Sequence, residues 1–321
     1  MVKLEYKLDK QTLECLYIKM LFSSKFASGK NAKIVKKRFD ELKEIYPYSV
    51  IFCDMSFDNI IFVEPENIKS LINKIELRII EQSEIEFKEI QKKKKLIYKT
   101  KGELKKVFDY IKFQPLISKF FEKELETRTC YFCNIHYVNE YKIDEKEYKN
   151  EFTLDHYYDK GSYPYLALSI YNLIPSCYVC NSKLKKTVEL DVFAPNAKNF
   201  DFDKKVKFKL LLSKSCKDLN IKTKENIDIQ LKERYSNEYK KYIELFKLNK
   251  RYQAHKDIVF EMIKNAELYP ESRLKELQDL TGIPYQEIKK DIFKLIDDEV
   301  DLSKEPFSKL KRDMAYELGL I

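Results

Sequence analysis

The amino-acid sequence predicts a mainly α-helical protein in which a small, irregular α+β module lies between two helical arms. Only 5 glycines and 9 prolines occur among the 321 residues, which favours long helices over a β-sandwich or a disordered chain. Cysteine, histidine, tyrosine and proline concentrate in the middle of the chain, where the helical periodicity fades. We therefore expect three regions, over residues 1–125, 126–200 and 201–321.

The first region has the patterns of several helices. Short amphipathic patterns predict helices over residues 10–23 and 31–45, and strand-like runs follow at 49–53 and 60–63. A longer helical pattern begins after Pro65 and places apolar side chains on one face, at Ile68, Leu71, Ile72, Ile75 and Ile79.

The last region begins with alternating residues and returns to helical periodicity. Residues 206–212 and 227–231 alternate apolar and polar side chains, which predicts two short strands. From about residue 233 the helical pattern resumes, and it includes residues 244–252 and a final helix within 306–320.

Basic residues exceed acidic residues by 61 to 52, which gives a formal net charge of +9. Both signs are abundant, so the excess fits a local basic groove better than a uniformly cationic surface. Lysines cluster at the end of the long N-terminal helical pattern, at Lys92, Lys93, Lys94, Lys95, Lys99, Lys101, Lys105 and Lys106. This run is either a strip for a phosphate backbone or a solvated helix end, and both interpretations stay open.

The chain lacks the long apolar run of a membrane span and the apolar core of a signal peptide, so we expect a cytosolic protein. In a reducing compartment disulfides are a poor explanation for its 7 cysteines. Three of them are scattered and are expected to be buried or incidental thiols, namely Cys15, Cys53 and Cys216.

The other four cysteines form two Cys-x-x-Cys pairs, Cys130 with Cys133 and Cys177 with Cys180. The two-residue spacing lets both sulfurs of a pair reach one ion, so two pairs predict a tetrahedral zinc site. Four protein ligands leave no open position, which makes this zinc structural. The interval between the pairs exceeds the ~15–20 residues of simple zinc modules, so it should contain a folded insert. On the cysteines alone, a zinc ribbon without chemistry is an equal alternative.

The insert carries Asp155-His156, then Asn172 within Asn-Leu-Ile-Pro-Ser-Cys, and then Asn181 directly after the second cysteine pair. This order and spacing resemble the HNH endonucleases, also called ββα-metal nucleases, and within them the zinc-containing members of prokaryotic defence and restriction systems. The clear match covers about residues 130–185, under a fifth of the chain. The resemblance implies a zinc-bound ββα-metal module between the helical arms.

The resemblance assigns catalytic roles to four residues. His156 would be the general base, since imidazole accepts a proton near neutral pH. Asp155 and Asn181 would bind a catalytic divalent cation, Mg²⁺ or Mn²⁺, through hard oxygen ligands. Asn172 would pin the intervening loop through backbone hydrogen bonds. Adjacent strand residues point to opposite faces, so Asp155 and His156 can share a site only if the strand ends or bends there.

Substrate contacts are expected from basic residues near this motif. Lys183 or Lys185 could clamp a phosphate oxygen, and Lys160 lies in the same insert. His136 is a substrate contact, an alternative metal ligand or a surface residue of the first hairpin, and the last of these is favoured.

The expected activity is therefore metal-dependent hydrolysis of phosphodiester bonds by an HNH endonuclease, with DNA favoured and RNA, such as transfer RNA, possible. A non-catalytic zinc-binding adaptor is the alternative. By analogy with similar proteins, the partners would be an ATPase or further copies of the chain in anti-phage defence. Two later segments loosely resemble the flanks of such proteins, namely Leu-Asn-Lys-Arg-Tyr-x-x-His255 and Pro306-Phe-Ser-Lys-Leu-Lys.

Overall fold

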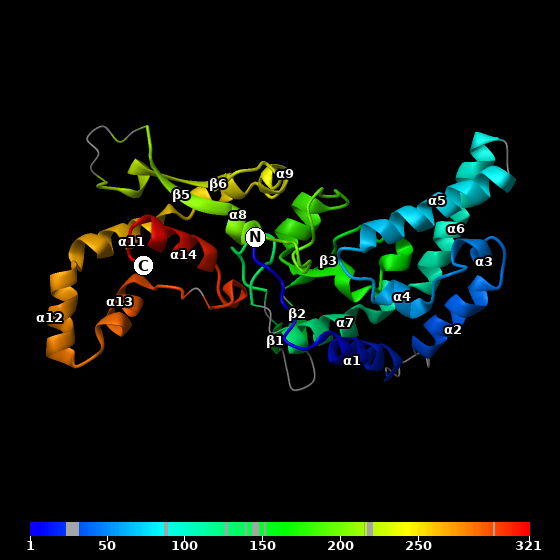
Figure 1. Ribbon diagram of the computed structural model, residues 1–321, viewed down its shortest axis with the longest axis horizontal. Coiled ribbons are helices and arrows are strands. Elements are labelled where there is room, and N and C mark those ends of the chain that lie inside the picture. Colours follow the sequence, from blue (N-terminus) through cyan, green and yellow to red (C-terminus); the bar gives the residue numbers. More distant parts are fainter. Residues whose placement is uncertain are drawn as a thin grey trace. The chain divides into compact units, whose positions relative to one another are not determined.

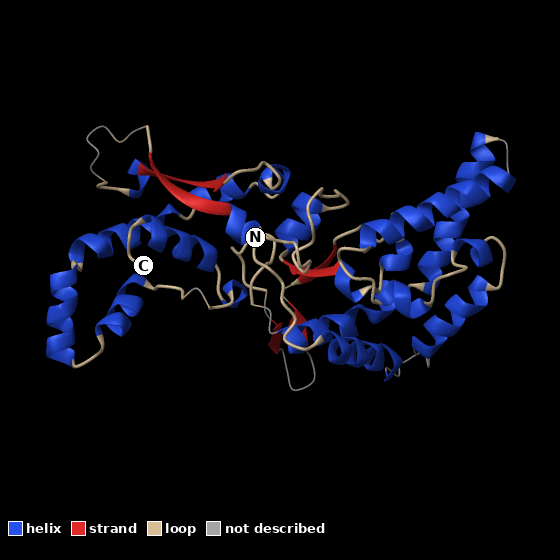
Figure 2. Cartoon of the chain, in the orientation of Figure 1, coloured by secondary structure: helices blue, strands red, loops and turns tan. Residues whose placement is uncertain are grey.

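The protein is mainly helical, as the sequence predicts (Figure 1, Figure 2). The computed structural model describes residues 1–23, 32–86, 89–125, 128–138, 140–142, 148–150, 152–214, 216, 221–297 and 299–321. Residue 31, where the second expected helix begins, lies outside the described residues.

The chain forms two compact units. The N-terminal unit contains Leu4–Thr127 and Val138–Phe200. The C-terminal unit contains Met1–Lys3, Arg128–Tyr137 and Asp201–Ile321. The region that the sequence sets apart as 126–200 thus contributes residues to both units.

Seven helices are described in the N-terminal unit: α1 (Lys10–Ser23), α2 (Ala32–Lys43), α3 (Tyr48–Ile51), α4 (Phe57–Ile61), α5 (Ile68–Glu86), α6 (Ile90–Val107) and α7 (Tyr110–Leu125). The predicted face of α5 is buried at four isoleucines. Aromatic rings fill the core between the shorter helices and α6. The Phe39 ring lies 5.3 Å from Phe52 and 5.7 Å from Phe108, and Phe57 stacks on Phe108 at 5.9 Å.

The strand-like runs at 49–53 and 60–63 were wrongly predicted, because these residues lie in or beside the short helices α3 and α4. A capping box starts α4. The Asn59 backbone N–H donates to Ser56 Oγ at 3.1 Å, and the Ser56 backbone N–H donates to Asn59 Oδ1 at 2.9 Å. A short apolar run does not distinguish a buried helix from a buried strand, so local hydrogen bonding decides.

A small β-structure completes the N-terminal unit. Strand β3 (Thr153–His156) pairs antiparallel with β4 (Leu173–Ser176), and Asp155 faces Ile174 in the register. Between them lie the 3₁₀ turns η1 (Pro164–Leu166) and η2 (Ile170–Asn172), and after β4 comes a π-helix, η3 (Val179–Lys185). A further pair, β1 (Glu140–Lys142) and β2 (Tyr148–Asn150), precedes them.

The C-terminal unit contains the two strands that the alternation predicts. Strand β5 (Val206–Leu212) pairs antiparallel with β6 (Ile227–Glu233). Buried Val206 and Phe208 alternate with less buried residues, as the pattern requires. The turn η4 (Lys224–Asn226) leads into β6, and helices complete the unit: α8 (Phe202–Lys205), α9 (Lys240–Leu245), α10 (Leu248–Gln253), α11 (Lys256–Leu268), α12 (Glu271–Thr281), α13 (Tyr285–Phe293), η5 (Leu302–Lys304) and α14 (Ser308–Glu317).

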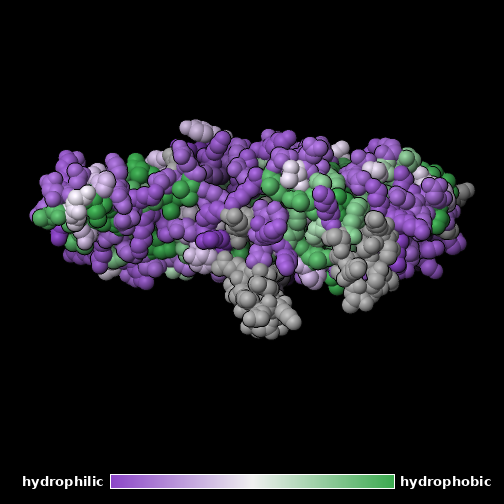
Figure 3. Space-filling model, turned by 90° about the horizontal axis from the view of Figure 1, so that it is seen from below, coloured by the Kyte–Doolittle hydropathy of each residue, from purple (hydrophilic) through white to green (hydrophobic). Residues whose placement is uncertain are grey.

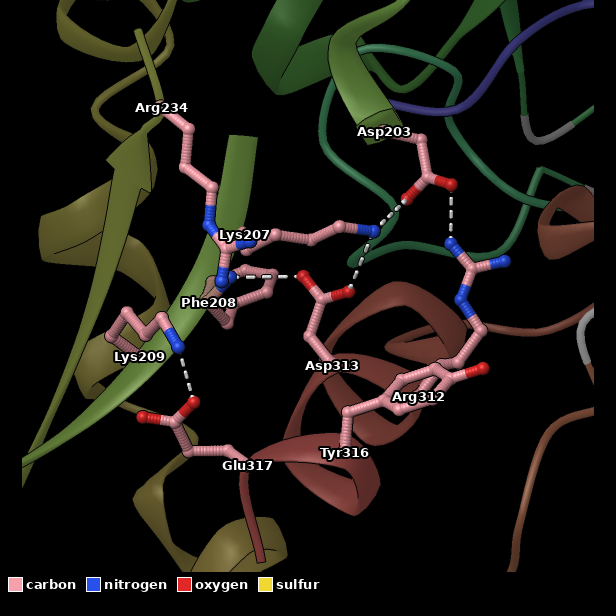
Figure 4. Close-up of a pocket in the computed structure, with 9 residues that line it drawn as sticks. All are labelled: Asp203, Lys207, Phe208, Lys209, Arg234, Arg312, Asp313, Tyr316 and Glu317. Carbon is pink, nitrogen blue, oxygen red and sulfur yellow. Dashed lines mark hydrogen bonds and ion pairs between the residues drawn. The ribbon is translucent and has the colours of Figure 1, made fainter. Parts of the chain in front are cut away.

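A charge cluster holds α14 against β5 and α8. The buried Lys309 ammonium lies 2.8 Å from Asp203 Oδ1 and 2.9 Å from Asp313 Oδ2, and Arg312 also pairs with Asp203. Asp313 Oδ2 accepts the backbone N–H of Phe208 at 2.9 Å, which ties the helix to the strand. A cavity of about 510 Å³ beside this cluster is also lined by Lys207, Lys209, Arg234, Tyr316 and Glu317 (Figure 4).

The face of the molecule drawn in Figure 3 is mostly hydrophilic, with separate hydrophobic patches.

Over the described part of the chain, every helix is too short or too polar to cross a lipid bilayer.

The cluster predicts an acid-sensitive stability. Burial alone would raise the pKa of Asp203, but the charges of Lys309 and Arg312 outweigh it and hold this pKa well below its usual value. The ion pairs of Asp203 therefore contribute their full stability above about pH 5, and this contribution is lost as the pH falls through the unfolded-state pKa of ~3.9 toward the lower folded-state pKa. We expect Asp203→Asn to be less stable at neutral pH and to lose less of its free energy of unfolding on acidification, measured by urea unfolding. The control Asp297→Asn should keep the wild-type pH profile, and a parallel profile for Asp203→Asn would contradict the assignment.

Candidate functional site

The sulfur atoms of Cys130, Cys133, Cys177 and Cys180 all lie within 4.8 Å of one another, and all four residues are buried. Zinc–sulfur bonds of ~2.3 Å in a tetrahedron separate the sulfurs by ~3.8 Å, so this spacing suits one ion. The four cysteines could therefore hold a metal such as zinc, as the sequence predicts. His136 does not belong to this group, and its side chain is exposed.

The first cysteine pair lies in a tight turn. The Asn134 backbone N–H donates to the Cys130 carbonyl at 2.8 Å, and the Cys130 N–H donates to the His136 carbonyl at 3.1 Å. Asn134 has a positive φ of 51°, a conformation that asparagine adopts more readily than most residues. The His136 backbone thus helps to close this turn.

Helix α10 covers the first pair. The Arg251 guanidinium donates from Nη2 to Cys133 Sγ at 3.4 Å, and the Tyr252 hydroxyl donates to the Cys133 carbonyl at 2.7 Å. A guanidinium beside a sulfur favours the thiolate, which is the form that binds metals. The Leu-Asn-Lys-Arg-Tyr segment therefore supports the cysteine turn. The sequence indicated this segment only by a loose resemblance, and it did not predict that Arg251 and Tyr252 contact Cys133.

The second flanking motif contacts the same turn through Asn134, which is fully buried. The Phe307 N–H donates to the Asn134 carbonyl at 2.7 Å, and the Lys309 N–H and the Ser308 hydroxyl each donate to Asn134 Oδ1 at 3.1 Å. The Asn134 amide donates in turn to the Leu302 carbonyl at 3.0 Å. The Pro306-Phe-Ser-Lys segment therefore also supports the first cysteine turn.

The second cysteine pair leads directly into η3. The Cys180 backbone N–H donates to Cys177 Sγ at 3.5 Å, and the Asn181 N–H donates to the Cys177 carbonyl at 3.1 Å. A single π-helical turn is uncommon and often occurs at functional sites. The position of Asn181 is therefore fixed by the cysteine turn before it.

Helix η3 lies over one face of β3. Because side chains alternate along a strand, Thr153 and Asp155 lie on one face and His156 on the other. The Asn181 amide donates to Thr153 Oγ1 at 2.9 Å. The Lys185 ammonium lies 3.0 Å from Asp155 Oδ2 and donates to the His156 carbonyl at 3.1 Å. Both η3 side chains thus contact the face that carries Asp155.

Asp155 and Lys185 form an ion pair that is almost wholly inaccessible, since each side chain is about 1% exposed. Burial raises the pKa of Asp155 to about 6, although the charge of Lys185 opposes this shift. Apart from this ion pair, the buried Oδ2 atom has no hydrogen-bond partner among the residues that the structure describes. Lys185 therefore faces inward, away from any substrate, and only Lys183 remains for the expected phosphate clamp.

His156 lies in a different environment on the opposite face. Its Nε2 atom is 3.0 Å from the Ala167 carbonyl, and its ring meets the Tyr110 ring edge-to-face at 4.5 Å. Burial, followed by the charge of Lys160, lowers the pKa of His156 to about 3, so the imidazole is neutral at physiological pH. A carbonyl only accepts hydrogen bonds, so Nε2 carries the proton and Nδ1 keeps the lone pair.

Asn172 holds the loop between β3 and η1. Its Oδ1 atom accepts the Tyr158 N–H at 2.8 Å, and its amide donates to the carbonyls of Tyr158 at 3.0 Å and Leu166 at 3.3 Å. Its backbone carbonyl accepts the Tyr157 N–H at 2.9 Å. One side chain thus links both ends of the loop that follows His156.

The remaining expected contacts are arranged around the same hairpin. The Lys160 ammonium lies 4.3 Å from the centroid of the Tyr110 ring. The same ring packs edge-to-face against the His156 imidazole. Lys183 is exposed and lies 5.5 Å from the centroid of the Tyr178 ring. The strand remains regular through His156, so the bend that would direct Asp155 and His156 to one face is not seen.

No family model, no curated protein and no solved structure matches this chain.

Metal content tests the cysteine cluster. We expect wild-type protein purified without chelator to contain one zinc ion per chain by elemental analysis. Cys177→Ser should lose this zinc and much of its solubility, because structural zinc contributes directly to folding. The control Cys15→Ser changes an exposed cysteine and should retain the metal. Zinc-free wild-type protein, or full zinc in Cys177→Ser, would contradict the site.

A double-mutant cycle tests the buried ion pair. Lys185→Met leaves the Asp155 carboxylate buried without its partner, so the free energy of unfolding should fall by about 3–5 kcal/mol. Adding Asp155→Leu removes that charge and should restore most of the loss. The exposed neighbour provides the control, since Lys183→Met should change stability by less than about 0.5 kcal/mol. Additive losses in urea unfolding would show that the two side chains do not interact.

Proposed function

We propose that this chain is a metal-dependent endonuclease of the HNH type that hydrolyses phosphodiester bonds, preferentially in DNA. The observation that carries the proposal is the state of His156. A buried hydrogen bond to the Ala167 carbonyl holds the imidazole proton on Nε2, which leaves Nδ1 as a proton acceptor. A general base requires such a lone pair.

In the proposed reaction, His156 Nδ1 accepts a proton from the attacking water as the water attacks phosphorus. The Ala167 carbonyl and the Tyr110 ring hold the imidazole in one orientation, so no reorientation is needed during the step. Asn172 acts as a positioning residue, because it ties the Tyr158 backbone, just after the base, to the Leu166 carbonyl. Lys183 and Lys160 supply positive charge toward the phosphate.

A divalent cation, Mg²⁺ or Mn²⁺, would be held by the Asp155 carboxylate and the Asn181 amide oxygen. Because β3 is regular through His156, the end of this strand would have to bend for the cation and His156 to act on one phosphate. Asp155 would offer its buried Oδ2 atom, whose partner in this structure is the Lys185 ammonium. When bound, the cation supplies positive charge to the phosphate and the departing oxygen. The Lys185 ammonium stands 3.0 Å from the same carboxylate, so Lys185 must share or release Asp155 in the metal-bound state.

A second candidate function is a zinc-bound docking module without catalysis. The observation that favours it is the same ion pair, because Lys185 already neutralises Asp155 and the two motif residues face opposite sides of β3. Under this alternative the protein binds nucleic acid or a partner protein and catalyses no reaction.

The wider biological role rests on resemblance alone. It suggests an anti-phage or restriction system in which an ATPase, or further copies of the chain, is the partner. Helices α1 to α7 would then provide docking surfaces, since the β3–β4 hairpin and η3 by themselves contain the residues proposed for catalysis.

Plasmid nicking tests the proposal. Wild-type protein should convert supercoiled plasmid to open-circular DNA when Mg²⁺ or Mn²⁺ is added. His156→Ala should reduce the rate by at least about 100-fold, because it removes the proton acceptor. Single-stranded DNA and transfer RNA should be assayed in parallel to define the substrate.

The other two histidines are matched controls, and both His136→Ala and His255→Ala should retain nicking. Full activity in His156→Ala would exclude His156 as the base. Wild-type protein that binds nucleic acid but cleaves none of the substrates with any divalent ion would support the docking module instead.

A further inference from the structure

Helix α6 carries one stripe of lysine and tyrosine. Lys94, Tyr98, Lys101 and Lys105 follow one another at spacings of four, three and four residues, so they share one helical face. At ~1.5 Å per residue the stripe is about 16 Å long. Figure 1 shows α6 beside α5, which covers another side of it.

This stripe forms one wall of a groove. A cavity of about 360 Å³ lies between it and Gly161 and Pro164, which belong to the loop that follows His156. Three of the lining side chains are lysines, and none of those that the structure describes is acidic. The groove therefore combines positive charge with flat, uncharged surfaces.

The loop wall is fixed to the helix. The Lys101 ammonium donates to the Ser162 carbonyl at 2.9 Å and pairs with Glu76 at 2.7 Å. Glu76 also accepts the Tyr165 hydroxyl at 3.2 Å. The same loop begins directly after His156, the candidate base. Only four residues therefore separate this base from the groove wall at Gly161.

The groove has an excess of positive charge. Lys94 and Lys105 form no ion pair with any acidic residue in the described part of the chain. Desolvation, with a contribution from the charge of Lys105, lowers the pKa of Lys160, although Asp159 opposes the shift. Lys105 and Lys160 are therefore close enough to repel each other, and an anion between them would relieve that repulsion.

Tyr98 indicates what kind of polyanion fits. Tyr98 is 82% exposed, which is unusual for a residue of this size and leaves its ring accessible. Exposed rings beside basic side chains are the stacking platforms of proteins that bind single strands. A base within a duplex is already stacked between its neighbours, so only an unpaired base can use this ring.

We propose that the α6 groove, formed by Lys94, Tyr98, Lys101, Lys105 and the loop at Gly161 and Pro164, binds a single-stranded segment of nucleic acid. Lys94 and Lys105 neutralise its phosphates, Lys101 holds the loop wall in place, and Tyr98 stacks on an unpaired base. That this segment is delivered to His156 for cleavage rests on the proposed function, whereas its binding in the groove does not. DNA and RNA share the chemistry that the groove recognises.

Binding is measured by fluorescence anisotropy with His156→Ala protein, so that cleavage does not interfere. The probes are a labelled single-stranded oligodeoxynucleotide, an oligoribonucleotide of the same sequence, and the corresponding DNA duplex. We expect the single strands to bind more tightly than the duplex, with an affinity that falls steeply between about 50 and 200 mM salt. The difference between the first two probes reports which sugar is preferred.

Two groove variants and one control are compared. Lys94→Glu/Lys105→Glu should weaken single-strand binding at least tenfold and reduce its salt dependence, and Tyr98→Ala should weaken it about fivefold or more. Lys232→Glu/Lys240→Glu makes the same charge change at exposed lysines of β6 and α9 and should bind like the parent. Circular dichroism verifies that every variant is folded.

Single-strand affinities that are unchanged in both groove variants, or losses equalled by the control, would overturn the proposal. A duplex preference that is insensitive to Tyr98→Ala would overturn the single-strand assignment. If wild-type protein cleaves DNA but the groove variants bind normally, the groove proposal fails and the nuclease proposal stands. If the groove variants lose binding but wild-type protein cleaves nothing, the nuclease proposal fails and the groove proposal stands.

Discussion

The alternation of side chains along β3 is the constraint on which the candidate site depends. Four residues pair in register with β4, so Asp155 and His156 must leave the strand on opposite faces. One face contacts η3, and there Lys185 meets Asp155. The other contacts α7 and the end of η1, and there Tyr110 and the Ala167 carbonyl meet His156. Two adjacent residues therefore acquire unrelated surroundings.

Burial shifts the pKa values of Asp155 and His156 in opposite directions. It raises the pKa of Asp155 to about 6 and lowers the pKa of His156 to about 3, because in each case it disfavours the charged form. The carboxylate is stabilised by Lys185, whereas the imidazole needs no counter-charge once it is neutral. Under the proposed function, His156 would accept the proton of the attacking water while Lys183 and Lys160 supply positive charge.

The sequence predicted features that depend on local spacing and missed those that depend on distant contacts. Two Cys-x-x-Cys pairs predicted the metal cluster because each pair is a local turn, and alternation of apolar and polar residues over most of each run predicted β5 and β6. The short apolar runs at 49–53 and 60–63 carried no such periodicity, and capping by Ser56 made a helix of the second. Nothing local reveals that Lys185 faces Asp155 or that Arg251 contacts Cys133, since tertiary packing creates both contacts.

The protonation state of His156 tests the account most directly. The chain has only 3 histidines, so ¹⁵N NMR of the imidazole nitrogens at about pH 7 can be assigned with His136→Gln and His255→Gln variants. A neutral ring protonated at Nε2, with Nδ1 as acceptor, is the predicted result. A doubly protonated imidazolium, or a ring protonated at Nδ1, would contradict the arrangement of β3, η1 and α7 on which the catalytic proposal is built.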